Sequence, residues 1–67
     1  MAQHQQNVRE AARSMIRRYG HAALEQTDQR IGELGKLGEV EAVALWREIR
    51  TAVQDLTDGG EYRPDDG

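Results

Sequence analysis

The sequence has 67 residues, a net charge of −3, no cysteine and 4% aromatic residues. A chain of this length holds one domain at most and buries a smaller share of its surface than a larger domain does, so self-association is the first source of extra stability to consider. Because cysteine is absent, neither disulfides nor thiolate metal sites can supply that stability.

Charge is distributed unevenly along the sequence. Residues 1–20 hold four arginines and one glutamate, whereas residues 21–67 hold five basic and eleven acidic residues. Phosphate binding needs a surplus of Lys and Arg, which the whole sequence lacks, so we expect no nucleic-acid partner. The polar stretch 1–7 has no apolar signal core, and no run approaches the roughly 20 apolar residues that span a bilayer. We therefore expect a cytoplasmic protein without a membrane partner.

The first predicted helix covers about residues 3–19. Its apolar residues share one face at helical spacing: Val8, Ala11, Ala12, Met15, Ile16 and Tyr19. Arg9, Arg13 and Arg17 follow the opposite face, each four residues from the last. These arginines are candidate contacts for phosphates or an acidic protein surface, although a solvated face is the simpler interpretation. Gly20 is suited to end the helix because glycine accepts a left-handed backbone.

The second predicted helix covers about residues 22–37. One face carries Ala23, Leu24, Thr27, Ile31 and Leu34. Gly32 and Gly35 each weaken this helix by up to about 1 kcal/mol relative to alanine. Because Gly35 falls toward the apolar face, we expect it to permit a close approach between helices, and we expect Gly38 to form the turn.

The third predicted helix covers about residues 39–56 and has the clearest apolar face. That face holds Ala42, Leu45, Trp46, Ile49, Val53 and Leu56. Large aromatic side chains dominate small cores, so we interpret Trp46 as the main core residue and not as a binding hot spot, with Tyr19 packed beside a turn. We expect residues 1–57 to form a single domain and the acidic residues 58–67 to form a disordered tail.

Together these segments predict an all-α protein. Short connections favour antiparallel neighbours, so residues 22–37 and 39–56 are expected to form a helical hairpin. The helix over 3–19 has two possible places. It packs on its own hairpin in a small three-helix bundle, or it opens outward into a dimeric helical bundle.

Three local patterns carry a resemblance to a known family. They are Ala12-x-x-x-Ile16-x-x-Tyr19-Gly20-x-x-Ala23, Leu34-x-x-x-Gly38 and Trp46-x-x-Ile49-x-x-Ala52-Val53-x-x-Leu56. Over residues 11–56 the sequence resembles a family of short, uncharacterised helical proteins from alphaproteobacteria. Those relatives often have Asp, a good helix cap, where this sequence has His21 and Glu39. The resemblance implies a helical fold and no particular activity.

No motif for catalysis, a cofactor or a metal stands out. His4 and His21 are far apart and belong to no metal-binding spacing, and the hydroxyl residues show no nucleophile motif. We therefore expect a protein that is not an enzyme and that needs no cofactor or metal.

Two functions remain open at this stage. The first is a protein that self-associates or binds another protein through apolar helix faces, with core and interface residues Val8, Met15, Tyr19, Leu34, Trp46, Ile49, Val53 and Leu56. The alternative is a small regulator that acts on nucleic acid or on a nucleic-acid-binding protein through the basic first helix or the acidic remainder. Salt dependence separates the two, because charge-led complexes weaken steeply in salt.

Overall fold

A computed structural model describes residues 2–58 of the chain, and the side chains of residues 4–58. The elements are α1 (Ala2–Tyr19), a short 3₁₀ turn η1 (Gly20–Ala22), α2 (Ala23–Lys36) and α3 (Val40–Asp58). The all-α prediction is confirmed, and each predicted helix lies within two residues of its expected bounds. The predicted tail begins later than expected because Asp58 still belongs to α3, and its remaining residues lie outside the described part of the chain.

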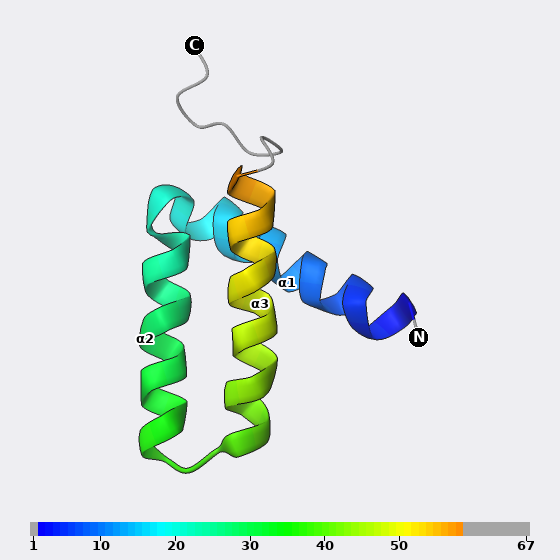
Figure 1. The fold of residues 1–67 in the computed structure, drawn as a ribbon. Coiled ribbons are helices and arrows are strands. Elements are labelled where there is room, and N and C mark those ends of the chain that lie inside the picture. The colour runs from blue at the N-terminus through cyan, green and yellow to red at the C-terminus, as the bar shows by residue number, and fades with distance from the viewer. Residues whose placement is uncertain (1, 59–67) are drawn as a thin grey trace.

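Helices α2 and α3 run antiparallel as a hairpin, and α1 crosses the hairpin steeply near its open end (Figure 1). Helix α1 packs against both of the other helices. Gly20 provides the sharp change of direction after α1, because its φ of 55° lies in the left-handed region that glycine adopts without strain. The three helices of one copy therefore already share a core.

A Schellman motif ends α2 at the closed end of the hairpin. The N–H of Glu39 donates to the carbonyl of Leu34 at 3.0 Å, and the N–H of Gly38 donates to the carbonyl of Gly35 at 3.1 Å. Gly38 has a φ of +76°, which this motif requires at its left-handed position. The predicted turn at Gly38 is confirmed and has a defined hydrogen-bonded geometry.

The expectation that Gly35 permits a close helix approach is wrong. A Cβ atom built on Gly35 meets nothing within 4 Å. The residue instead borders a hollow of about 250 Å³ at the closed end, with Val40, Val43 and Ala44. The close approach occurs near the open end of the hairpin, where small residues Ala12, Ala23 and Thr27 are buried.

Replacing Gly35 with alanine is therefore expected to stabilise the protein. A methyl group fits the open space, and the free energy of unfolding should rise by about 0.5–1 kcal/mol through the higher helix propensity of alanine. Gly38→Ala is the matched control and should lower it by about 1–2 kcal/mol, since its backbone is left-handed. Thermal unfolding followed by circular dichroism measures both; a destabilised Gly35→Ala variant would show that Gly35 is tightly packed after all.

The core lies at the open end of the hairpin. It consists of eight buried apolar residues from all three helices: Val8, Ala12, Ile16, Ala23, Ile49, Ala52, Val53 and Leu56. Val53 is fully buried and is the largest apolar side chain with no exposed surface. Three of the eight are alanines, which let α1 lie close across the hairpin because they hold the backbones apart by only a methyl group.

Candidate protein-interaction surface

The residues proposed from the sequence as core or interface fall into two groups. Val8, Ile49, Val53 and Leu56 lie together in the buried core. The other four are Met15, Tyr19, Leu34 and Trp46, none of which is fully buried. Met15 and Trp46 are partly buried and pack against the core, Leu34 is partly buried, and Tyr19 is 40% exposed.

Trp46 packs against the edge of the core and is half-buried. Val53, two turns further along α3, occupies the centre that the sequence analysis assigned to Trp46. Trp46 also lines a groove that it shares with Met15, Arg18 and Tyr19 of α1. One part of the indole is therefore available to a further contact.

The closed half of the hairpin has apolar side chains but no core of its own. Between Asp28 and Glu48, all within the described part of the chain, no side chain is buried. Leu37 is 73% exposed and Leu45 is 40% exposed. We call this stretch, residues 28–48, the uncovered half of the hairpin.

Leu45 continues a row of side chains that α1 covers further along α3. It lies four residues before Ile49 and seven before Ala52, so all three share one side of the helix. Ile49 and Ala52 are buried with α1 residues in the core, whereas Leu45, one turn earlier, is 40% exposed. The apolar row thus extends past the element that covers it.

A groove of about 380 Å³ lies where α1 meets the uncovered half, and we call it the α1 groove. Its residues come from all three helices: Met15, Arg18, Tyr19, Gln26, Gln29, Arg30, Glu33 and Trp46. Apolar surface from Met15 and Trp46 is combined there with two guanidinium groups. Arg30 also forms a long 3.4 Å ion pair with Glu33 on its own helix. Such a groove fits an apolar side chain that is flanked by acidic groups.

The three predicted contact arginines do not line this groove. Arg9 borders a shallow hollow between α1 and α3 together with Glu48 and Asp55. Arg17 is exposed and Arg13 is half-buried. The α1 arginine that lines the groove is Arg18, next to Tyr19. The sequence analysis did not include Arg18 among the predicted contact arginines.

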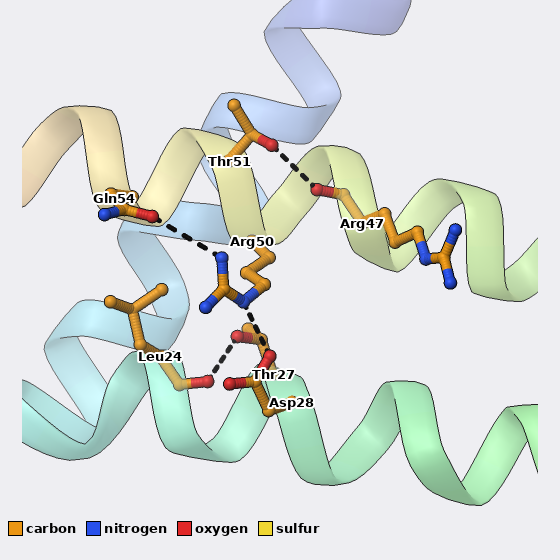
Figure 2. Close-up of polar contacts among 7 residues, drawn as sticks. All are labelled: Leu24, Thr27, Asp28, Arg47, Arg50, Thr51 and Gln54. Atoms are coloured by element: carbon orange, nitrogen blue, oxygen red, sulfur yellow. Dashed lines mark hydrogen bonds and ion pairs between the residues drawn. The ribbon is translucent and has the colours of Figure 1, made fainter.

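Two polar contacts join α3 to the other two helices. Arg50 of α3 donates from Nε to Asp28 Oδ1 of α2 at 2.6 Å and also contacts Gln54 at 3.4 Å (Figure 2). His4 Nε2 lies 2.9 Å from Glu48 Oε1 and joins α1 to α3. Both pairs are substantially exposed, so each contributes little to stability and acts mainly on orientation.

Three threonine hydroxyl groups donate hydrogen bonds to backbone carbonyls of their own helices. Thr27 is buried and its Oγ1 donates to the carbonyl of Leu24 at 2.7 Å, as Thr51 does to Arg47 at 3.1 Å (Figure 2). Thr57 donates to Val53 and Gln54 in the same way. Among the described residues, no buried side-chain nitrogen or oxygen lacks a hydrogen-bond partner. The hydroxyls of these three threonines therefore donate hydrogen bonds within their own helices.

Two other kinds of site were sought in the described chain. No three His, Asp or Glu side chains gather there as metal ligands. None of the helices within residues 2–58 combines the length and the apolar character that crossing a bilayer requires.

The exposed leucines carry a signal that sequence analysis could have used. Leu37 falls seven residues after Arg30 and four after Glu33, on one side of α2. The sequence analysis interpreted Leu37 only as the end of a helix. Whether such a residue is exposed depends on the position of α1, which decides which half of each apolar face is covered. That position depends on the angle at Gly20, which the sequence left open.

Comparison of the sequence with protein families, with curated proteins and with solved structures found no match.

Proposed function

We propose that this protein is a non-catalytic interaction protein that self-associates through the uncovered half of its hairpin. The observation that carries the proposal is the apolar row of α3, which continues from the buried Ile49 to the exposed Leu45, together with the exposed Leu37 directly after α2. Exposed apolar surface next to a core is typical of interaction sites. The polar groups found near it are surface ion pairs and helix-bound hydroxyls, which suit a binding surface.

A second copy is the occupant that size and charge favour. The core contains eight small or medium apolar residues, so a single copy buries little surface and gains much from a shared interface. The surface is also complementary to itself. Residues 1–20 have an excess of three positive charges, whereas Glu33, Glu39 and Glu41 with Lys36 give the closed end an excess of two negative charges. Complementary charges of this kind guide association and orientation.

A charge-led function is the second candidate. Arg9 and Arg17 are exposed on α1, which supports contact with nucleic acid or with an acidic protein surface. The neighbouring acidic residues Glu48 and Asp55 weaken the positive potential near Arg9. We therefore rank this function below self-association.

The double variant Leu37→Glu/Leu45→Glu tests the proposed function. Each leucine buried in an interface contributes about 1.5–3 kcal/mol, so removing both from each copy should weaken self-association by roughly 100-fold or more. Sedimentation equilibrium across a wide concentration range measures this. Folding should persist, because both side chains are already exposed in one copy.

The matched control is Gln6→Glu/Gln54→Glu, which makes the same charge change at two exposed positions outside residues 28–48. It should associate like the unchanged protein. Equal weakening by both double variants would point to a general charge effect, and a protein that stays monomeric at every concentration would refute self-association. Association that survives high salt favours the apolar surface, whereas loss of binding in salt favours the charge-led alternative.

A further inference from the structure

The α1 groove and the closed end of the hairpin carry opposite net charges: Arg18 and Arg30 exceed Glu33 in the groove, whereas Glu39 and Glu41 exceed Lys36 at the closed end. The groove offers Met15 and Trp46 as apolar surface, with Arg18 and Arg30 beside them. The closed end offers Leu37, which is 73% exposed, followed closely by Glu39 and Glu41. One copy does not bring its own Leu37 into its own groove, because Leu37 directly follows α2 and lies seven residues, about 10 Å along the helix axis, from Arg30.

Building on the proposed self-association, we propose that two copies pack antiparallel, each inserting Leu37 into the α1 groove of the other. A two-fold axis that passes beside Leu34 brings Arg30 of one copy opposite Leu37 of the other. This follows because Arg30 lies four residues before Leu34 and Leu37 lies three residues after it. Trp46 lies beside Arg30 in the groove, so it meets the same inserted leucine. Half-buried Leu34 then packs against Leu34 of the second copy.

The antiparallel arrangement follows from the position of α1 and from charge. Helix α1 forms a ledge across the open half of the hairpin, which leaves the uncovered half free to meet its counterpart (Figure 1). A parallel pair would place the two α1 ledges against each other and hold the uncovered halves apart. It would also bring together two acidic ends that contain Glu33, Glu39 and Glu41. The antiparallel pair instead sets each acidic end beside Arg18 of the other copy.

Disulfide cross-linking of single-cysteine variants tests the arrangement, and the absence of cysteine from the natural sequence makes the readout clean. Leu37→Cys and Arg30→Cys are made separately, one of them with a mass tag, and are mixed under mild oxidation. Both positions are exposed, so folding should persist and circular dichroism checks it. We expect the mixed 30–37 disulfide to exceed the Leu37→Cys homodimer by about tenfold, because only close Cβ atoms can be bridged.

The matched control mixes Val40→Cys with Arg47→Cys, which are also seven residues apart but line the separate hollow. It should give no covalent dimer above background. A dominant Leu37→Cys homodimer would establish a parallel pair and overturn the antiparallel arrangement while leaving self-association intact. A dimer by sedimentation without the mixed disulfide would overturn the arrangement in the same way. A monomer at every concentration would overturn both the arrangement and the proposed function.

Discussion

Replacing Val53 with aspartate is expected to abolish the cooperative unfolding transition of the protein. Val53 is fully buried where α3 meets the rest of the core, so the new carboxylate would have neither water nor a charged partner. Burying an unpaired charge costs several kcal/mol, which is comparable to the whole stability of a small domain. Circular dichroism at 222 nm should show a broad, shallow thermal response in place of a sigmoidal transition.

The neighbouring exposed residue provides the control for that experiment. Gln54→Asp introduces the same side chain one position along the same helix, where it remains in water. Its transition should stay within about 0.5 kcal/mol of the unchanged protein, as surface substitutions usually do. If Val53→Asp unfolds cooperatively at a similar temperature, Val53 does not lie at the centre of the core.

Enlarging Ala12 to leucine is expected to separate α1 from the hairpin. Ala12 has no exposed surface and lies in the core with Ala23 and Ala52, where the helix backbones are close. Added side-chain volume at such a site forces a shift that costs about 1–3 kcal/mol. In a domain of this size, each 1 kcal/mol lowers the melting temperature by about 4–8 °C.

Trp46 makes the displacement of α1 visible, because it is the single tryptophan of the sequence and shares a groove with Met15 of α1. Ala12→Leu should therefore shift the fluorescence of Trp46 toward that of a solvent-exposed indole. Ala44→Leu adds the same volume at an exposed position of α3 and should leave both readouts unchanged. Equal melting temperatures for the two variants would mean that α1 does not depend on a close approach at Ala12.

Helix content and helix bounds could be predicted from the sequence because they depend on local signals. The 3.6-residue spacing of apolar side chains identified the face of α3, and the glycines at Gly20 and Gly38 marked both changes of direction. Four of the eight proposed core or interface residues, Val8, Ile49, Val53 and Leu56, are buried together. All four lie on the apolar faces that helical spacing predicts.

The position of α1 could not be predicted, because it depends on contacts between residues far apart in the sequence. A helical wheel places Leu45 and Ile49 on the same apolar face and predicts similar burial for both, yet Ile49 is 4% exposed and Leu45 is 40% exposed. The difference comes from where α1 crosses α3. The proposed core or interface set also contained no alanine. A small side chain gains little from burial itself, and it contributes by letting two helix backbones approach closely. For Gly35 the sequence analysis predicted a close helix contact, but the structure shows open space beside it.

The confinement of every buried side chain to the open end gives the molecule a gradient of local stability. Between Asp28 and Glu48 the described chain is held by helix hydrogen bonds, surface ion pairs and the Schellman turn, without a buried core beneath them. Segments with few buried contacts open at a lower free energy than the global unfolding of a protein. The closed end of the hairpin can therefore change shape while the open end stays folded, so the surface that we propose for self-association is also the part of the fold that adapts most easily to a partner.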